Sequence, residues 1–446
     1  MITRIFSTIL LGLLIGQMSI VAQADLSLSQ AIEKGLQNNY KIQIAERDIE
    51  IAENNNDWGV AGKYPTVSFN ISSANTYTNR KDPAGFLIEQ STLSNGITPS
   101  LDLNWVLFDG FRVQITKEQL EKMESLSQNS AKVTVENTIQ DIILAYNSVL
   151  LQAQQLAVID TVMRLSRDRV EYQEIRKEFG QAGTFDLLQS QNAYLDDSTT
   201  YLIQLTNYEN AMRNLNQVMG EDDLTQRYRL TDTLAFTPQN YDLADLQQRM
   251  LANNHQLNNL FINRELAQIN TRLQESRLKP SLSLNSGLSY GYTLSNGSQQ
   301  FVTQDPRDIN ASSRTLSGNV NLTFSYTLFD ANVRKINIQN AKLDEMISQL
   351  TIEDTKRMLN TQLSNTLATY NNQKRLVEVT RANVENAQRN LNISEERFRG
   401  GLISSFDYRT VQLNYVNATQ GLLNSIYNLK VTETELTRLI GGLIRK

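Results

Sequence analysis

The residue types that usually carry catalysis or bind metals are scarce in this chain of 446 residues. It has no cysteine and a single histidine, His255. The cysteine count excludes disulfides, thiolate metal sites and cysteine nucleophiles, and one histidine excludes a metal site built from several. We expect His255 to be a structural or surface residue. The phosphate-binding loop, the zinc-protease histidine pair and the serine nucleophile elbow do not occur, so the sequence predicts neither an enzyme nor a cofactor.

Acidic residues that recur in the sequence are better candidates for a function. Asp186 and Asp407 each follow a phenylalanine just after a glycine-containing turn. A carboxylate at the start of a helix is favoured by ~0.3–1 kcal/mol, so a purely structural interpretation stays open for both residues. Asp109 and Asp330 each follow Leu-Phe, where a strand is expected to give way to a helix. We expect these two residues to be helix N-caps.

The N-terminus has the three parts of a secretory signal peptide, which we place at residues 1–24. Arg4 supplies the positive charge, residues 5–15 are mostly apolar, and Ala22-Gln23-Ala24 fits a cleavage site. The apolar run is shorter than the ~20 residues of a membrane-spanning helix, and no later segment approaches that length. The mature protein is therefore expected outside the cytoplasm. The formal net charge of −5 gives no support to a nucleic-acid partner.

Long segments with few helix breakers predict four long helices. They cover residues ~110–178, ~184–219, ~331–399 and ~404–440, and the last contains only one interior glycine, Gly421. A helix over residues 112–178 would be ~100 Å long at ~1.5 Å per residue. Such a helix is too long for an ordinary globule, so it must pack along other long helices.

Alternation of polar and apolar residues predicts four strands, at residues ~64–80, ~97–108, ~280–294 and ~315–329. Each can supply the ~9–11 residues that a tilted membrane strand needs. The polar segments 79–96 and 295–314, which join the strands of each pair, are expected to be exposed loops. Four aromatic residues of these strands fit either an interfacial girdle or ordinary strand packing: Trp105, Tyr290, Tyr292 and Tyr326.

The chain is internally duplicated, with repeats at residues 25–230 and 231–446. Asn38-Asn39 recurs 215 residues later, whereas Leu107-Phe108-Asp109 and Met219-Gly220 recur 221 residues later. The difference must be inserted within the second strand pair, as expected for an exposed loop. Each chain then contributes four strands. An open sheet would leave its edges unsatisfied in lipid, and barrels begin at about eight strands, so several copies are needed; their number stays open.

With these features the sequence resembles the TolC-like outer-membrane efflux family. The duplication carries the resemblance, together with the segments 105–110 and 326–330 and the Phe-Asp turns at 179–187 and 400–408. It implies an α+β membrane protein, a homotrimer in which four strands per chain form a 12-stranded outer-membrane β-barrel. A long periplasmic α-helical barrel would continue it. The implied function is the passive channel of a tripartite efflux pump or a type I secretion system. The implied partners are a periplasmic adaptor (membrane fusion) protein, an inner-membrane RND or ABC transporter, and outer-membrane lipid.

The same resemblance implies roles for individual residues. Acidic residues at the positions of Asp186 and Asp407 line or brace the periplasmic gate in this family. A further family aspartate is Thr410 here and a family tyrosine is Phe398, so we expect a gate with less negative charge and no hydroxyl-mediated bond. The adaptor is implied to contact the tips of the helix hairpins, at Gly180, Gly183, Gly400, Gly401 and Leu402. Glycines at these positions also suit helix ends, where they adopt the left-handed conformation.

Two other functions fit parts of the sequence less well. A non-conducting coiled-coil stalk or adhesin would have no need for four strands of membrane length. A self-sufficient porin would not combine four strands with several hundred helical residues. The sequence does not identify the exported substrate.

Overall fold

The computed structural model describes residues 24–82 and 86–444, so the predicted signal peptide lies outside the described residues except for Ala24. The chain forms two compact units. Unit 1 comprises Met1–Gln43, Thr134–Asn254 and Leu359–Lys446, and unit 2 comprises Ile44–Val133 and His255–Met358. Each unit takes segments from both sequence repeats, so the units are not the two repeats.

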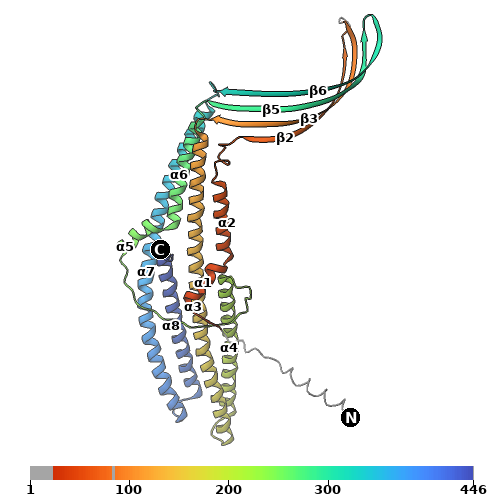
Figure 1. The fold of residues 1–446 in the computed structure, drawn as a ribbon. Coiled ribbons are helices and arrows are strands. Elements are labelled where there is room, and N and C mark those ends of the chain that lie inside the picture. Colours follow the sequence, from red (N-terminus) through yellow and green to blue (C-terminus); the bar gives the residue numbers. More distant parts are fainter. Residues whose placement is uncertain (1–23, 83–85, 445–446) are drawn as a thin grey trace, which may run out of the picture. The chain divides into compact units, whose positions relative to one another are not determined.

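Most of the described chain is helical (Figure 1). The longest helices are α3 (Arg112–Glu178) and α7 (Val333–Arg399), and the return helices are α4 (Thr184–Met219) and α8 (Ser405–Leu439). The shorter helices are α1 (Leu28–Asn38), α2 (Tyr40–Asn55), α5 (Leu243–Asn253) and α6 (His255–Ser276). None of these helices contains proline, and only α1 and α8 contain a glycine, Gly35 and Gly421. Apolar residues recur in them every three to four positions.

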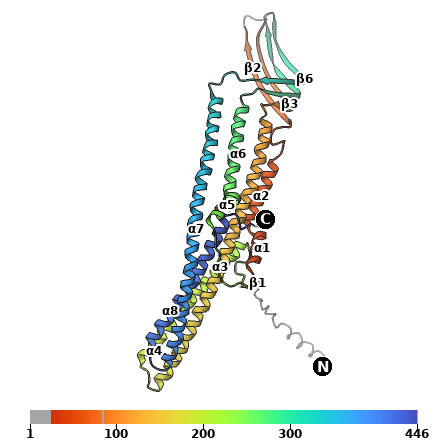
Figure 2. The same ribbon diagram turned by 90° about the vertical axis from the view of Figure 1, so that its left-hand side faces the viewer.

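In unit 1, α3 with α4 and α7 with α8 form two helix hairpins that lie side by side (Figures 1 and 2). Fully buried side chains of all four helices make the core, among them Val149, Leu215, Tyr370 and Leu429. A short parallel pair of strands, β1 (Ala24–Leu26) and β4 (Tyr228–Leu230), joins the start of the described chain to the end of the first repeat.

One repeated motif ties the short helices to the end of each return helix. Asn39 donates its side-chain amide to the carbonyl of Val218, and Asn254 donates to that of Leu439. The glycine after each return helix, Gly220 or Gly441, has a positive φ, and a Cβ there would collide with the backbone of the neighbouring Asn-Asn pair. The recurrence of Asn-Asn and of Met/Ile-Gly in the sequence therefore marks one contact that is built twice.

The sheet of unit 2 contains β2 (Thr66–Lys81), β3 (Leu87–Phe108), β5 (Ser281–Phe301) and β6 (Gln304–Ser325). These strands pair antiparallel in the order β2-β3-β5-β6. Only Val302 and Thr303 separate β5 from β6.

The expectation of exposed loops at residues 79–96 and 295–314 is wrong where it can be tested, because residues 79–81, 87–96, 295–301 and 304–314 belong to strands. Residues 83–85 of the first segment lie outside the described residues. The hydrogen bonds between strands are made by the backbone, so a run of polar side chains does not by itself end a strand. The turn-like dipeptides Asn95-Gly96 and Asn296-Gly297 lie inside β3 and β5. A Cβ at Gly297 would overlap the carbonyl of Ser91, so this glycine serves a close approach of two strands. The residues inserted in the second repeat therefore lengthen β5 and β6 and not the loop that joins them.

One described helix, α3, is long enough and contains a window apolar enough to cross a membrane, although no such helix was expected. Half of that window is buried inside the protein. Packing against the other helices of unit 1 accounts for its apolar character.

Candidate functional site: the exposed sheet and the tips of the helix hairpins

The four-stranded sheet has one apolar and one polar face. Residues that pair across neighbouring strands share a face. Phe69 pairs with Leu101, which pairs with Leu288. On the opposite face Asn70 pairs with Ser100, which pairs with Ser289. The alternation that predicted these strands therefore separates two chemically different surfaces.

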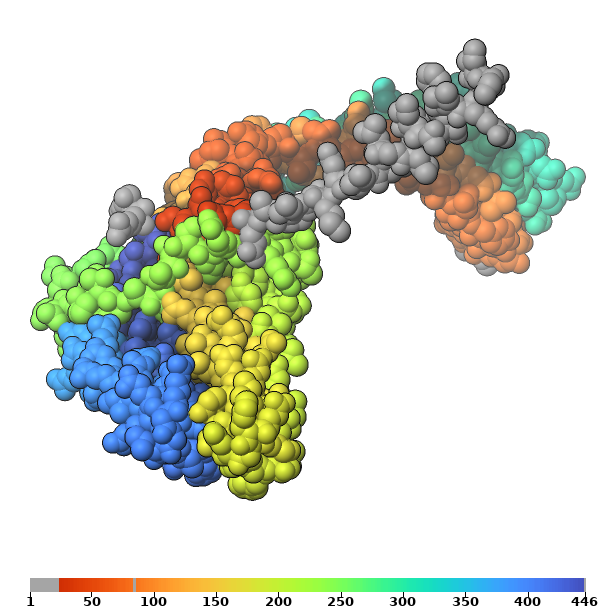
Figure 3. Space-filling model, turned by 90° about the horizontal axis from the view of Figure 1, so that it is seen from below, coloured from red at the N-terminus to blue at the C-terminus, as the bar shows by residue number. Residues whose placement is uncertain are grey.

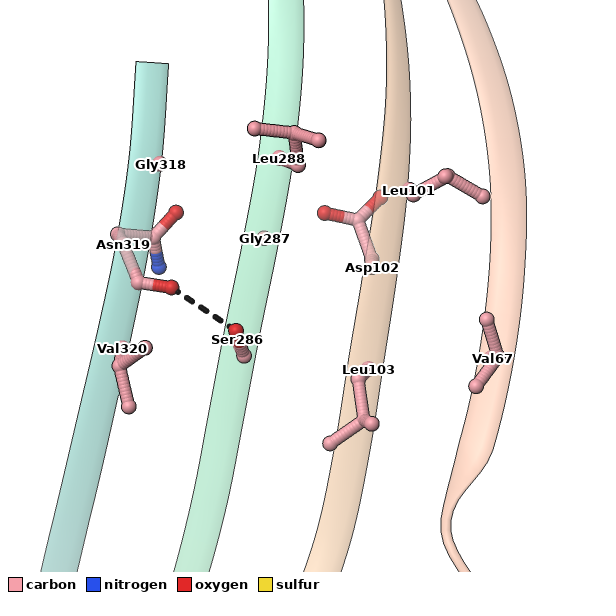
Figure 4. Close-up of a pocket in the computed structure, with 10 residues that line it drawn as sticks. All are labelled: Val67, Leu101, Asp102, Leu103, Ser286, Gly287, Leu288, Gly318, Asn319 and Val320. Atoms are coloured by element: carbon pink, nitrogen blue, oxygen red, sulfur yellow. Dashed lines mark hydrogen bonds between the residues drawn. The ribbon is translucent and has the colours of Figure 1, made fainter.

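The apolar face is exposed in the single chain. Phe69, Val320 and Leu322 have more than half of their surface open. Figure 4 shows a shallow hollow among Val67, Leu103 and Val320, where Ser286 and Gly318 supply no large side chain. An exposed apolar surface of this extent marks a contact with lipid or with another protein.

The apolar band has the height of a membrane strand. In β3 it runs from Trp105, opposite Leu284, to Ile97, opposite Tyr292. This segment of nine residues agrees with the ~9–11 residues that cross a bilayer at a tilt. Tyr292 and Trp105 lie at opposite ends of the band, and the Arg314 guanidinium stands 5.8 Å from the Tyr292 ring centre. Beyond Tyr292 the same face carries mostly Asn, Ser and Gln, so the strands extend past the apolar band.

The four predicted aromatic residues do not all belong to the sheet. Trp105, Tyr290 and Tyr292 lie in strands, but Tyr326 follows the end of β6. The strand ends earlier than the sequence pattern suggested. The indole N–H of Trp105 donates to the carbonyl of Lys63 at 3.0 Å.

Both edges of the sheet, β2 and β6, lack a paired strand within the described chain. An unpaired edge costs several kcal/mol for each backbone group exposed to hydrocarbon. The sheet therefore needs strands from other copies if its apolar face lies in lipid.

The hairpin tips end in matched glycine turns. Gly180 and Gly401 have φ values of 70° and 72°, and each begins a pair of hydrogen bonds back to the preceding helix. These bonds satisfy carbonyls that the helix end leaves open. A Cβ at either glycine would meet nothing within 4 Å. Figure 3 shows this end of unit 1, with the α3–α4 turn in yellow next to the α7–α8 turn in blue.

The tips also carry exposed apolar side chains. Phe179, Phe185, Leu402 and Phe406 are all more than 60% exposed. Gly183 precedes α4, and Gly400 directly precedes the turn glycine Gly401. The predicted adaptor-contact residues therefore gather at an exposed end with apolar character.

Asp186 and Asp407 lie in the first turn of their helices. The Asp186 carboxylate accepts the N–H of Gly183 at 3.2 Å, and that of Asp407 accepts the N–H of Ser404 at 3.2 Å. At Asp407 the bond is reciprocal, because the Ser404 hydroxyl accepts the Asp407 N–H. The pair of Ser404 and Asp407 is a capping box. Gly183 has no side chain, so Asp186 supplies only the carboxylate half of that arrangement. Each carboxylate therefore has a structural role at the helix start. Thr410 lies one turn later and donates its hydroxyl to the Phe406 carbonyl.

Phe398 belongs to an aromatic cluster near the same tip. Its ring stacks on Tyr408 with centroids 5.0 Å apart, and Tyr172 meets it edge-on at 5.7 Å. Phe398 and Tyr408 are buried, and burial raises the pKa of the Tyr408 hydroxyl. Phe398 thus packs the α7–α8 hairpin against α3.

Asp109 and Asp330 are not at the N-cap positions that were predicted. Their helices begin at Arg112 and Val333, because the residues between have positive φ angles and turn the chain back. Each carboxylate nevertheless accepts a backbone N–H of the first helical turn and pairs with the arginine there. The arginine beside Asp330 lowers the pKa of that carboxyl.

Sequence reasoning missed a buried ion pair that joins the two hairpins. The Arg409 guanidinium of α8 donates two hydrogen bonds to the Asp197 carboxylate of α4, at 2.6 and 2.7 Å. Ser166 of α3 donates to the same carboxylate. Arg169, only 4% exposed, lies close by and donates to Gln412 at 3.3 Å. Burial, together with the charge of Arg409, lowers the pKa of Arg169 to about 10.

A second polar cluster lies farther from the tips in unit 1. Glu435 of α8 accepts hydrogen bonds from Gln140 of α3, Gln362 of α7 and Arg438. Burial raises the pKa of the neighbouring Glu136 carboxyl to about 7, although the charge of Arg438 opposes this shift.

His255, at the start of α6, has its Nδ1 atom 3.2 Å from the side-chain oxygen of Asn129. Burial lowers the pKa of this imidazole. Within residues 24–82 and 86–444, no three acidic or histidine side chains come close enough to hold a metal ion.

Comparison with known proteins matches both repeats to one family. The family model described as "outer membrane efflux protein" matches residues 31–221 and 246–442. A comparison with curated proteins finds no match.

Solved structures with a similar fold include outer-membrane channels. A structure of CusC, described in terms of transmembrane channel formation, superposes with a TM-score of 0.73 at 14% identity, over 94% of this chain and 93% of that one. The CmeC outer membrane channel of Campylobacter jejuni gives 0.71 at 16% identity, over 93% and 85%. The open state of the MtrE outer membrane channel of Neisseria gonorrhoeae gives 0.68 at 14% identity, over 93% and 89%.

Proposed function

Because this chain belongs to the outer membrane efflux protein family, we propose that it is the passive outer-membrane channel of a tripartite efflux pump or a type I secretion system. Its place is the outer membrane, with the helical part in the periplasm. The observation that carries the proposal is the sheet of unit 2, with an exposed apolar face of membrane height, a polar opposite face and two free edges.

Three copies would complete this sheet. Four strands from each chain give a twelve-stranded barrel, which exceeds the minimum of about eight strands. The free edges β2 and β6 run antiparallel to each other, so β6 of one copy can pair with β2 of the next. The apolar face would meet outer-membrane lipid and the polar face would line the pore.

The pore wall suits a passive conduit. Its Asn, Ser and Thr side chains offer hydrogen bonds but little charge, so they impose little chemical selection. We assign no catalysis and no cofactor to the chain. The energy for transport would come from an inner-membrane RND or ABC transporter.

The hairpin tips are the proposed contact with a periplasmic adaptor protein. Their glycine turns and exposed apolar side chains support this assignment. Replacing Gly401 and Leu402 with bulky charged residues should abolish efflux in a complementation assay while the yield of assembled protein stays unchanged. Full efflux by this variant would refute the assignment.

The gate is proposed to lie at the same tips, around Asp407 with Asp186 on the neighbouring hairpin. Three copies would bring three carboxylates of each kind towards one axis, where they repel one another and attract cations. Phe398 and Thr410 would contribute no charge to this gate.

The proposal is tested by native mass spectrometry of detergent extracts together with conductance in planar lipid bilayers. We expect three subunits and discrete conductance steps. A stable monomer with full β content would contradict the assembly. A trimer without conductance would indicate the alternative, a non-conducting stalk or adhesin.

A further inference from the structure

The polar face of the sheet carries one acidic side chain at the height of the apolar band. Among the strand residues at this height, only Asp102 and Arg314 are charged. Arg314 pairs with Tyr292 on the apolar face, where its guanidinium stands near the tyrosine ring. Asp102 pairs with Gly287 on the opposite face. Its carboxylate therefore belongs to the face that would line the proposed pore.

No basic side chain of the four strands lies close enough on this face to offset the charge. The nearest are Arg80 and Arg307, which share a row with Gln90. Residues 90 and 102 are twelve positions apart in β3, which is about 40 Å at ~3.3 Å per residue. At physiological ionic strength an exposed charge is largely screened beyond ~8 Å. Within the strands, the carboxylate of Asp102 is therefore uncompensated.

The hydrogen bonds of Asp102 do not need its charge. The Oδ2 atom accepts the Asn70 amide and the Ser100 hydroxyl, both at 2.9 Å. The side-chain oxygen of an asparagine could accept both bonds. In the second repeat the equivalent position, 221 residues later, is Thr323 of β6. The sheet thus requires a polar residue at this position but not an ionised one.

The other carboxylate oxygen faces a space that a glycine leaves free. A Cβ at Gly287 would stand 3.2 Å from the Oδ1 atom of Asp102 and 2.9 Å from the Oδ1 atom of Asn319. Figure 4 shows these two side chains on the strands at either side of Gly287. Both atoms are hydrogen-bond acceptors, so this part of the face favours a cation over an anion.

An ionisable side chain at membrane depth is costly and is usually kept for a function towards a water-filled cavity. We propose that Asp102 gives the barrel part of the pore a preference for cationic over anionic solutes. Each copy supplies one such carboxylate, so a barrel closed by several copies carries a ring of them. The ring belongs to unit 2, whereas Asp186 and Asp407 belong to unit 1. The favoured cargo is therefore neutral or positively charged.

The test is the reversal potential of the purified channel in planar bilayers between ~0.1 M and ~0.01 M KCl, where the Debye length is ~10–30 Å. We expect the unmodified protein to prefer K⁺ and Asp102→Asn to shift the reversal potential towards zero. In a gradient near ~1 M KCl the two proteins should differ less, because the Debye length falls to ~3 Å.

Glu89→Gln is the matched control, because it removes the same charge from the opposite face of the same strand. Glu89 pairs there with Lys81, at 3.1 Å between the charged groups. We expect no shift of the reversal potential in this variant. Should Asp102→Asn fail to fold, Asp102→Thr, which copies the second repeat, takes its place.

The absence of native cysteine allows the charge to be restored or reversed at one position. Treatment of Asp102→Cys with a sulfonate methanethiosulfonate reagent should restore the preference for K⁺, and a trimethylammonium reagent should shift it towards Cl⁻.

This inference rests on the proposed channel function, and the same recordings separate the two. A conducting channel whose reversal potential does not respond to Asp102→Asn, or responds equally to Glu89→Gln, would overturn the inference and leave the proposed function intact. Absence of conductance in the unmodified protein would overturn both.

Discussion

The buried ion pair between Asp197 and Arg409 should be a main determinant of the stability of unit 1. Its two side chains are 9% and 17% exposed, so solvent screens the pair little. Removing one partner of a buried pair typically costs about 3–5 kcal/mol, because the other charge stays buried without compensation. We expect Asp197→Asn to fall in this range.

The two partners should not be equivalent. Asp197→Asn leaves two guanidinium groups, those of Arg409 and Arg169, close together without their carboxylate. Arg409→Leu leaves a carboxylate that still accepts the Ser166 hydroxyl and still lies near Arg169. We therefore expect Arg409→Leu to be less destabilising than Asp197→Asn.

The second repeat suggests a compensating variant. At the equivalent positions it has Ala418 and Leu188, so Asp197→Ala combined with Arg409→Leu recreates an apolar contact. Replacement of a buried ion pair by apolar residues is often neutral or stabilising. The double variant should recover much of the stability that Asp197→Asn loses.

The assay is thermal unfolding in detergent, followed by circular dichroism at a fixed scan rate for all variants. We expect the midpoint of Asp197→Asn to fall by several degrees, with Arg409→Leu between it and the double variant. Equal midpoints for Asp197→Asn and the unmodified protein would refute the reasoning.

Three further outcomes follow from the structure. Gly220→Ala should lower the unfolding midpoint, because its Cβ would stand 2.6 Å from a backbone oxygen at a φ of 75°; Gly421→Ala, in open space within α8, should not. Burial raises the pKa of the Glu136 carboxyl from 4.5 to about 7. Its contribution to the free energy of unfolding is therefore fully present below pH 4.5, and about 3 kcal/mol of it is lost as the pH rises through 7. Comparing midpoints with Glu136→Gln across this range should show that slope only in the unmodified protein. Asp407→Asn keeps a capping side chain but removes the charge, so bilayer recordings should show a weaker preference for cations. Unaltered ion selectivity would mean that Asp407 acts only as a helix cap and not in a gate.

The long helices could be predicted because their signal is local. Glycine and proline are absent from α3 and α7, and no tertiary information is needed to see it. The duplication was equally visible, since the Asn-Asn and Met/Ile-Gly pairs recur at nearly fixed spacings. Its structural meaning, a contact between Asn39 or Asn254 and the end of a return helix, needed the fold.

Strand ends and caps were harder to predict. The polar residues of β3 and β5 resemble loop residues, yet their backbones continue the ladder past the apolar band. Asp109 and Asp330 lie two residues before the true N-cap positions, because residues such as Phe111 adopt a positive φ that composition does not predict.

The ion pair between Asp197 and Arg409 joins residues 212 positions apart, so no local pattern could pair them. The burial of Asp197 beside Ser190, Ala193 and Gln204, where a charge needs a partner, also becomes visible only in the fold, because this stripe of α4 is mostly polar in the sequence.

The proposed pore makes the two faces of the sheet distinguishable by experiment. Ser289 and Leu288 are neighbours in β5 on opposite faces, and the chain has no native cysteine. The most direct test is therefore single-channel recording of Ser289→Cys and Leu288→Cys during treatment with a charged methanethiosulfonate reagent. We predict stepwise loss of conductance in Ser289→Cys and none in Leu288→Cys. Loss in Leu288→Cys alone, or no conductance in either variant, would contradict the account of this sheet as the wall of an outer-membrane channel.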